Sequence, residues 1–294
     1  MWELMHGIGP PLATPFTEDG ALDESSLRDL VAWVQSRGVD FLVPCGSNSE
    51  AELMTDDERT RTIEIVADAA DVPVLAGTGS PGFAETRAAT ADAAAVGADA
   101  ALVVTPFYYT HDADSLVAYY EDLADVAEIP IYLYSVPVFT GTKLAPETVA
   151  RLAEHPNVAG LKDSSGDLEA CIRTRRLTAD ADFDLFVGSG STLAYALEAG
   201  ADGGVLALAN VAPGAASRVY ELAGSGDFDG ARELNDALVE LNHAVTARYG
   251  VAGLKAAMRR RGAPAGHARR PHRPASAEAT AHLADLLDDA PLLD

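Results

Sequence analysis

One lysine of this chain stands where a chemical role is favoured. Lys162 ends the apolar run VAGLK and is followed by the small polar residues DSSGD. A lysine at the end of a buried strand holds its amine in a partly dry site, where desolvation disfavours the charged form. A neutral amine is the nucleophile that forms a Schiff base with a carbonyl substrate. The alternative is a rim lysine paired with Asp163. Because only Lys143 and Lys255 accompany it in the whole sequence, we favour the chemical role.

A tyrosine closes the preceding apolar run. Tyr134 lies in PIYLYSVP, and adjacent strands of a sheet are about 4.8 Å apart, so its phenol could reach a group attached to Lys162. A phenol can move protons while an imine forms and a C–C bond breaks. The alternative is a buried tyrosine whose hydroxyl is satisfied locally. The two runs therefore predict a lysine–tyrosine pair, provided that they form neighbouring strands.

The loop GSNSE, residues 46–50, offers groups that could hold a carboxylate. Ser47 and Asn48 supply a hydroxyl and an amide next to backbone N–H groups, and such groups in a tight loop make an anion cradle. An ordinary turn with helix-capping residues is the commoner use of the same residue types. The loop alone does not distinguish these two roles.

Other motifs point to ligands that we do not expect. GTGSPG at 77–82 matches the GxGxxG of dinucleotide-binding proteins, but Pro81 and the number of predicted strands disfavour that interpretation. The basic segment 258–274 could bind nucleic acid or an anionic substrate, although a solvated surface or an intersubunit patch is the commoner explanation. The seven histidines show no metal-ligand spacing such as HExxH. We therefore expect no metal, no cofactor and no nucleic-acid partner.

The elements that must position these residues can be read from the hydrophobic pattern. Nearly continuous apolar runs predict strands buried on both faces, and amphipathic segments between them predict helices, so the strands should be parallel. The strands are expected at 8–13, 40–45, 73–78, 100–105, 130–135, 158–162, 183–188 and 203–208, and the helices at 23–37, 55–70, 83–96, 113–127, 145–154, 167–179 and 191–199. Eight such units in about 210 residues predict an α/β fold of the (β/α)₈ (TIM) barrel type, with a doubly wound sheet as the alternative. Barrel chemistry occurs at the carboxyl ends of the strands.

Beyond residue 210 the pattern contains helices only. They are expected at 213–223, 227–248, 251–261 and 276–289. We interpret residues 1–294 as a single domain, in which the barrel of residues 1–212 carries a C-terminal helical appendage of residues 213–294.

Composition narrows the class of protein. The chain has 294 residues, 48% of them hydrophobic, which suffices for one large core and is too high for disorder. It lacks an apolar run of about 18 residues, which a membrane span needs, and it lacks the features of a secretory signal. The two cysteines, Cys45 and Cys171, do not suggest a disulfide framework, so a cytoplasmic location is expected.

The charge balance is strongly acidic. Aspartate and glutamate number 45 against 21 lysines and arginines, which gives a net charge of −24 and disfavours nucleic-acid binding. Only three of the 21 cations are lysines. An acid excess with so little lysine predicts adaptation to high salt, where screening weakens repulsion between carboxylates. The alternative is an acidic enzyme of an ordinary cytosol.

Four motifs occur in an order and at a spacing that resemble a known family. They are GIGPPLATPF near the start, GSNSE, YSVP and GLKDSSGD. With AGTG, VVTPFYY and LKAAMRRRG, they resemble the dihydrodipicolinate synthase / N-acetylneuraminate lyase superfamily over nearly the whole chain. The resemblance implies a barrel with C-terminal helices, a homotetramer built as a dimer of dimers, and class I lyase chemistry on pyruvate or another 2-oxo acid without metal.

The same resemblance assigns roles to individual residues. Lys162 stands at the position of the Schiff-base lysine, and Tyr134 at that of the catalytic tyrosine. Ser47 and Asn48 stand where two hydroxyl residues usually hold the pyruvate carboxylate and relay a proton. Tyr108 matches a tyrosine that the synthase branch lends across a dimer interface.

The branch of the superfamily is suggested by departures from its motifs. Synthases resemble YNVPxRTG, and Phe139 occupies the place of that arginine; an apolar ring cannot replace a guanidinium that grips a carboxylate. Sialic acid lyases carry an acidic pair near 190–193 and a serine at the place of Ala207. Ser189 and Ser191 suit a shorter polyol.

The expected activity is therefore an aldolase of sugar-acid catabolism. Such an enzyme would cleave 2-keto-3-deoxygluconate or its 6-phosphate to pyruvate and glyceraldehyde or its 3-phosphate. The alternatives are 4-hydroxy-tetrahydrodipicolinate synthase, a sugar-acid dehydratase of the same fold, and a barrel that binds a metabolite without catalysis.

Overall fold

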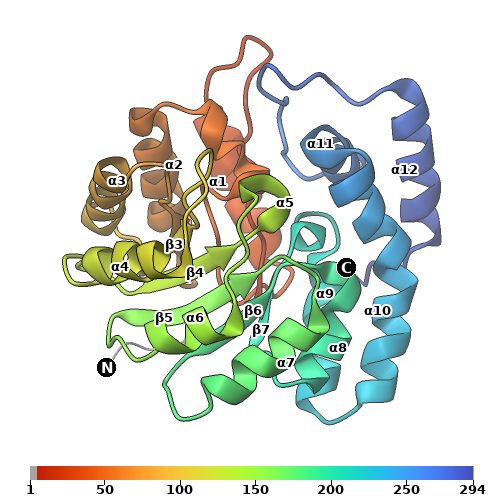
Figure 1. The fold of residues 1–294 in the computed structure, drawn as a ribbon. Coiled ribbons are helices and arrows are strands. Elements are labelled where there is room, and N and C mark those ends of the chain that lie inside the picture. Colours follow the sequence, from red (N-terminus) through yellow and green to blue (C-terminus); the bar gives the residue numbers. More distant parts are fainter. Residues whose placement is uncertain (1–4, 294) are drawn as a thin grey trace.

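A ring of parallel strands surrounded by helices forms the body of the protein (Figure 1). The computed structural model describes residues 5–293. Its strands form one sheet in the order β1-β7-β6-β5-β4-β3-β2, with every pair parallel. They are β1 (Gly7–Gly9), β2 (Leu75–Gly77), β3 (Ala100–Val104), β4 (Ile131–Ser135), β5 (Val158–Asp163), β6 (Asp184–Val187) and β7 (Gly203–Val205). The predicted (β/α)₈-type barrel is confirmed.

One of the eight predicted strands is wrong. Residues 40–45 make only isolated parallel bridges, Pro11 with Val43 and Leu42 with Val74. These bridges nevertheless close the ring between β1 and β2, because the Leu75 N–H donates to the Leu42 carbonyl over 2.9 Å. The ladder stops early because Pro10, Pro11 and Pro44 have no N–H to donate. The same prolines end β1 at Gly9, before the predicted residue 13.

Helices follow the strands as the pattern predicts. They are α1 (Glu24–Gln35), α2 (Asp56–Ala69), α3 (Phe83–Ala95), α4 (Ala113–Ala124), α6 (Pro146–Leu152), α7 (Leu168–Leu177) and α8 (Leu193–Glu198). Side chains of Asp23, Thr55, Asp112 and Asp167 accept backbone N–H groups at four of their starts, as helix N-caps do. The short helix α5 (Pro137–Thr140) was not predicted.

The C-terminal part of the chain is helical among the described residues. It comprises α9 (Pro213–Gly224), α10 (Phe228–His243), a π-helical turn (Ala244–Arg248), α11 (Gly250–Arg260) and α12 (Ala277–Asp289). We call residues 262–275, which connect α11 to α12, the strap. Within the strap, His267 bridges Phe16 near the start of the chain. The last segments of the sequence therefore return to the first.

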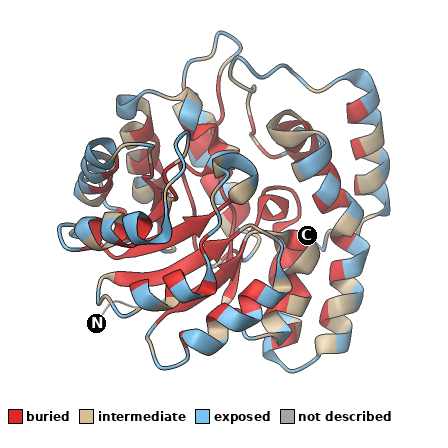
Figure 2. Ribbon diagram, in the orientation of Figure 1, coloured by how far each residue is buried: buried red, intermediate tan, exposed pale blue. Residues whose placement is uncertain are grey.

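The core has two parts. Figure 2 shows that the strands are buried and that the helices expose their outer faces. Inside the barrel lie large side chains such as Phe41, Leu102, Tyr132 and Phe186, while a second apolar layer fills the space between the strands and the helices. No helix in residues 5–293 is long and apolar enough to cross a membrane.

Candidate active site

Lys162 and Tyr134 face each other near the carboxyl ends of adjacent strands. They are direct partners in the parallel register of β4 and β5, and the Lys162 Nζ lies 4.1 Å from the centroid of the Tyr134 ring. Their exposed fractions are 2% and 5%. Lys162 also pairs in register with Phe186 of β6, which belongs to the core inside the barrel. The structure thus brings the two predicted catalytic side chains together inside the barrel.

The surroundings of the Tyr134 hydroxyl favour proton transfer. Burial by itself raises the pKa of Tyr134, but the Lys162 charge and hydrogen bonds with Ser47 and Ser164 outweigh it, and the pKa falls below its ordinary value of 10. The Ser47 Oγ lies 3.4 Å from the hydroxyl oxygen. When the pKa of a phenol is lowered, a larger fraction is phenolate near neutral pH, and the phenolate is the form that accepts a proton as a general base.

The loop from Gly46 to Glu50 is held in an unusual conformation. Ser47–Ser49 form a 3₁₀ turn, and the backbone has positive φ at Cys45 and Glu50 on either side of it, 58° and 59°. The Gly46 N–H donates to the Ser49 Oγ over 3.2 Å, and the Ser49 hydroxyl donates to the Leu12 carbonyl. The turn therefore fixes Ser47 beside Tyr134.

The first two glycines of the GxGxxG motif have a structural explanation. A Cβ on Gly77 would collide with the Cys45 carbonyl, and one on Gly79 would collide with the backbone N–H of Val104. Both glycines let neighbouring backbone approach closely, which is a common reason for glycine near a site. The motif thus lets β2 pack against the adjacent segments, and this packing accounts for its first two glycines.

A buried ion pair supports this loop, and sequence reasoning missed it. The Lys255 Nζ on α11 lies 2.6 Å from the Glu50 Oε1, and the two side chains are 1% and 0% exposed. The same amine donates to the carbonyls of Thr14 and His267 over 2.6 and 2.7 Å. Burial lowers the pKa of Lys255 to about 8, and the Glu50 carboxylate opposes that shift. The scarcity of lysine was the one sequence signal that could have identified Lys255.

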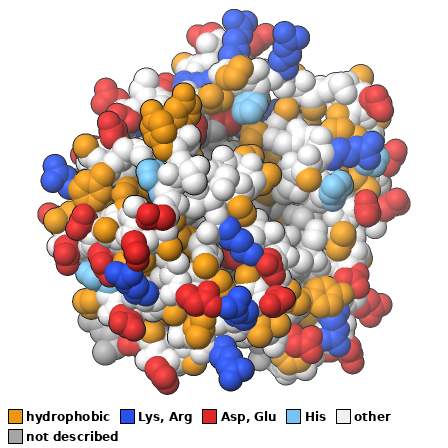
Figure 3. Space-filling model, in the orientation of Figure 1, with side chains coloured by type: hydrophobic (Ala, Val, Ile, Leu, Met, Phe, Trp, Pro, Cys, Tyr) orange, Lys and Arg blue, Asp and Glu red, His pale blue; other side chains and the backbone are white. Residues whose placement is uncertain are grey.

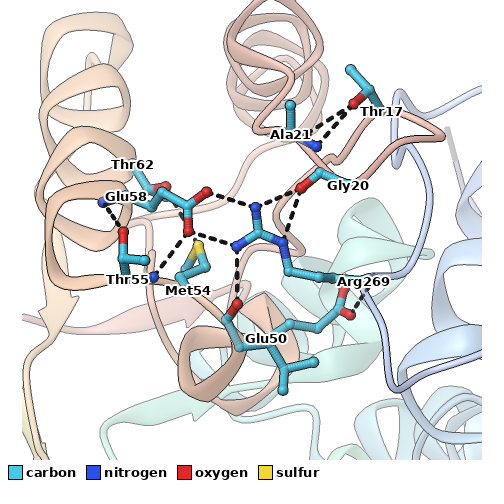
Figure 4. A network of polar contacts seen from close by, with 10 residues as sticks. Thr17, Gly20, Ala21, Glu50, Met54, Thr55, Glu58, Thr62 and Arg269 are labelled. Carbon is cyan, nitrogen blue, oxygen red and sulfur yellow. Dashed lines mark hydrogen bonds and ion pairs between the residues drawn. The ribbon is translucent and has the colours of Figure 1, made fainter.

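Arg269 fastens the strap to the same region (Figure 4). Its guanidinium donates to both carboxylate oxygens of Glu58 over 2.6 Å, and also to the carbonyls of Gly20 and Leu53 over 3.0 and 2.9 Å. Its backbone N–H donates to the Glu50 Oε2 over 2.8 Å. The basic segment, for which we expected a solvated surface or an intersubunit patch, therefore contains arginines that make internal contacts, Arg269 most extensively.

A cavity of about 340 Å³ opens beside the lysine–tyrosine pair. Its lining includes three of the predicted site residues, Ser47, Tyr134 and Phe139, and it also includes Val251 of α11 and His272 of the strap. Lys162 contacts the Tyr134 ring and is not part of the lining. Sequence reasoning did not foresee the contribution of the C-terminal part, because nothing in its pattern indicates which end of the barrel it covers.

The other predicted site residues lie outside the cavity lining. Tyr108 is 86% exposed on the loop after β3, with positive φ. Ser189 lines a separate small hollow beside Asp163, and the Ser191 Oγ accepts a hydrogen bond of 2.8 Å from the Asn242 amide. Asn48 is half-buried. In the single chain these four do not converge on Lys162.

The described surface carries many carboxylates on the viewed face. Figure 3 shows acidic side chains spread widely, with lysine and arginine side chains at the top of the view, where the strap lies in Figure 1, and also scattered among the acidic ones below. Several arginines form ion pairs with neighbouring acids, such as Arg61 with Glu24 and Glu64. These ion pairs neutralise only part of the acidic surface, because acidic residues outnumber lysine and arginine by 45 to 21.

Fold and site together define a barrel with a buried lysine and a buried tyrosine at the carboxyl ends of adjacent strands. Residues 4–290 match the model of the Dihydrodipicolinate synthetase family, and the chain belongs to this family. Its membership confirms the predicted superfamily and supports, in general terms, a lyase of the aldolase type.

Similar proteins cover nearly the whole chain. A 4-hydroxy-tetrahydrodipicolinate synthase of Methanothrix thermoacetophila is 38% identical over 97% of this chain and 96% of its own length. One of Haloarcula marismortui is 36% identical, with coverages of 96% and 92%. An uncharacterized DapA-like lyase of Halobacterium salinarum is 39% identical, with coverages of 97% and 94%.

Solved structures show the same fold. Dihydrodipicolinate synthase of Acinetobacter baumannii, complexed with pyruvate, has a TM-score of 0.93 and 31% identity, with coverages of 99% of this chain and 100% of its own. YagE, a prophage protein of Escherichia coli K12 that was solved with pyruvate, has a TM-score of 0.91 and 29% identity, with coverages of 97% and 98%. None of these relatives is named as a sugar-acid aldolase, so the predicted branch is a matter for proposal.

Proposed function

We propose that this protein is a class I aldolase that forms an imine between Lys162 and a 2-oxo acid. The observation that carries the proposal is the register pairing of Lys162 with Tyr134. It places a buried amine against a buried phenol near the carboxyl ends of the barrel strands. A lysine shielded from water is the nucleophile that such chemistry uses.

The reaction follows from the positions of these groups. The Lys162 amine attacks the C2 carbonyl, and water leaves to give a protonated imine. Tyr134 accepts the proton of the C4 hydroxyl while the C3–C4 bond breaks. The electron pair of that bond moves toward the imine nitrogen, so an aldehyde departs and an enamine remains. Protonation of the enamine at C3 and hydrolysis then release pyruvate and restore the amine.

The loop beside Tyr134 would hold the substrate's carboxylate. Ser47 already contacts the Tyr134 hydroxyl and lines the cavity. A carboxylate bound there by hydroxyl and backbone N–H groups would place its adjacent keto carbon near Lys162. We assign this role to Ser47 and, as its neighbour in the turn, to Asn48.

Within this chemistry we propose a 2-keto-3-deoxy sugar acid as the substrate. Among the described residues that line the cavity, none is lysine or arginine, and Phe139, which is 70% exposed, stands at its mouth. Condensation with aspartate semialdehyde needs a cation for the second carboxylate. A second candidate is 4-hydroxy-tetrahydrodipicolinate synthase, which the names of the similar proteins favour.

Trapping tests the imine. We expect borohydride with pyruvate to attach a three-carbon adduct to Lys162 and to inactivate the enzyme, and we expect Lys162→Ala to lose both the adduct and turnover. Peptide mass spectrometry locates the adduct, and Lys143→Ala serves as the control that keeps it. An adduct on another lysine, or none, contradicts the proposal.

Comparison of two reactions tests the branch. We expect kcat/KM for cleavage of 2-keto-3-deoxygluconate to exceed that for condensation of pyruvate with aspartate semialdehyde. Loss of a bidentate ion pair in a partly dry site costs about 2–5 kcal/mol, or roughly 30-fold or more in affinity. Condensation at equal or greater efficiency, in the same buffer, would assign the enzyme to the synthase branch.

A further inference from the structure

The outer part of the cavity has few polar groups available to a substrate. Of the ionisable side chains in its lining, Glu50 is committed to Lys255 and to the strap. The Thr140 hydroxyl, which also lines it, donates to the carbonyls of Val136 and Thr142 over 3.3 and 3.0 Å. Glu52 and His272 remain, among apolar neighbours such as Phe107 and Val251.

Glu52 brings a carboxylate to this part of the cavity. It lies in the 3₁₀ turn Ala51–Leu53, directly after the loop that carries Ser47. Glu52 is exposed and lines the cavity, so its carboxylate is open both to water and to a substrate in the cavity. A second anion beside it would be repelled, whereas a hydroxyl could donate to it.

His272 brings an exposed imidazole, and the strap fixes its backbone. Arg269, three residues earlier, is tied to Glu58, Gly20 and Leu53, and the His272 N–H donates to the Arg269 carbonyl over 3.0 Å. A neutral imidazole offers one donor and one acceptor, which matches a hydroxyl. Groups held before the substrate arrives bind it with less loss of entropy.

The cations of the strap do not change this balance. Arg270 and Arg273 flank His272 in the sequence, but both are exposed and neither lines the cavity. The polar character of the outer cavity is therefore set by Glu52 and His272.

We propose that Glu52 and His272 bind the hydroxyl groups of an uncharged, polyhydroxylated substrate tail, so that the enzyme accepts the free sugar acid and discriminates against its terminal phosphate. The inference rests on the proposed aldolase function and adds the substrate class. Glu52 accepts from one hydroxyl, and His272 both donates to and accepts from hydroxyl groups farther along the tail. The apolar ring of Phe139, which lines the cavity, offers no hydrogen bond to a charged end.

The test compares 2-keto-3-deoxygluconate with its 6-phosphate in one buffer. We expect the parent enzyme to prefer the free acid by about 10-fold or more in kcat/KM. His272→Leu should lower kcat/KM for the free acid about 10-fold, mainly through KM. Glu52→Gln should reduce the preference by a similar factor, because the repulsion of phosphate is lost while hydrogen bonding to hydroxyls is kept. His243→Leu, at the exposed end of α10, is the matched control.

Pyruvate trapping shows whether a negative result contradicts the role of Glu52 and His272 or the aldolase proposal. Pyruvate trapping at Lys162, measured on every variant, reports whether the fold and the imine site are intact, and His272→Gln replaces His272→Leu if the latter does not trap. A trapping-competent parent that prefers the phosphate, or that keeps its preference in both variants, overturns the role of Glu52 and His272 alone. A trapping-competent parent that cleaves neither acid overturns the proposed sugar-acid substrate as well. A parent that traps no pyruvate overturns the aldolase proposal itself.

Discussion

The Tyr134 hydroxyl lies against both the Lys162 amine and the Ser47 hydroxyl. In the proposed mechanism the phenol accepts the proton of the C4 hydroxyl. We therefore expect Tyr134→Phe to keep the fold and pyruvate trapping but to lower kcat by about 100-fold or more, the usual contribution of a positioned acid–base group. Steady-state kinetics with circular dichroism checks this, with Tyr132→Phe as a tyrosine control from the same strand. A kcat within twofold of the parent would remove Tyr134 from the mechanism.

The two catalytic candidates could be predicted because their positions depend on local sequence. An apolar run identifies a buried strand, and its last residues fall at the chemical end of a barrel, as they do for Lys162 and Tyr134. The pairing of Glu50 with Lys255 could not be predicted, because it joins residues from opposite ends of the chain and a lysine on a helix usually faces solvent. The place of His272 in the cavity could not be predicted either, because the sequence pattern does not indicate which end of the barrel the C-terminal part covers.

At the scale of elements, the strap and α2 are joined by Arg269 and Glu58. The hydrogen bonds from Arg269 lower the pKa of Glu58 to about 2. A carboxylate whose folded pKa is depressed contributes stability that is complete above its ordinary pKa, near 4.5, and that is lost as the pH falls from there to about 2. The side chain is 30% exposed, so solvent screening reduces the contribution to about 1–2 kcal/mol.

Glu58→Gln tests this junction. We expect the variant to unfold more easily than the parent at pH 7 and to approach the parent's free energy of unfolding as the pH falls below 4. Urea unfolding at several pH values measures the difference. Glu147→Gln, which removes an exposed partner of Arg173, is the control and should change little at any pH. A difference that stays constant from pH 7 to 3 would contradict the depressed pKa.

The prediction of elements succeeded where periodicity decides and failed where proline intervenes. Helix starts agree with the sequence because Asp23, Thr55 and Asp167 cap them locally. Residues 40–45 read as a strand from their apolar character, yet Pro44 and the prolines that face them leave isolated bridges. Apolar patterning reports burial, and it does not report whether each N–H can complete a ladder.

At the scale of the whole molecule, a net charge of −24 should make stability depend on salt. Repulsion among surface carboxylates opposes the compact state, and dissolved ions screen it. We expect the melting temperature to rise steadily from millimolar to molar KCl, with any loss of oligomer confined to low salt. Thermal melts and light scattering across the series measure both. A melting temperature that does not change would reject adaptation to high salt.

The strap also fixes the order in which the protein can mature during synthesis. Lys162 and Tyr134 belong to the first two-thirds of the chain, but the loop beside them is held by Lys255 and by the backbone of Arg269. A nascent chain that has left the ribosome only as far as α10 therefore carries the Lys162 amine without the contacts that fix the neighbouring loop. If the loop binds substrate as proposed, that ability arrives almost last, together with the segment that brings His272 to the cavity.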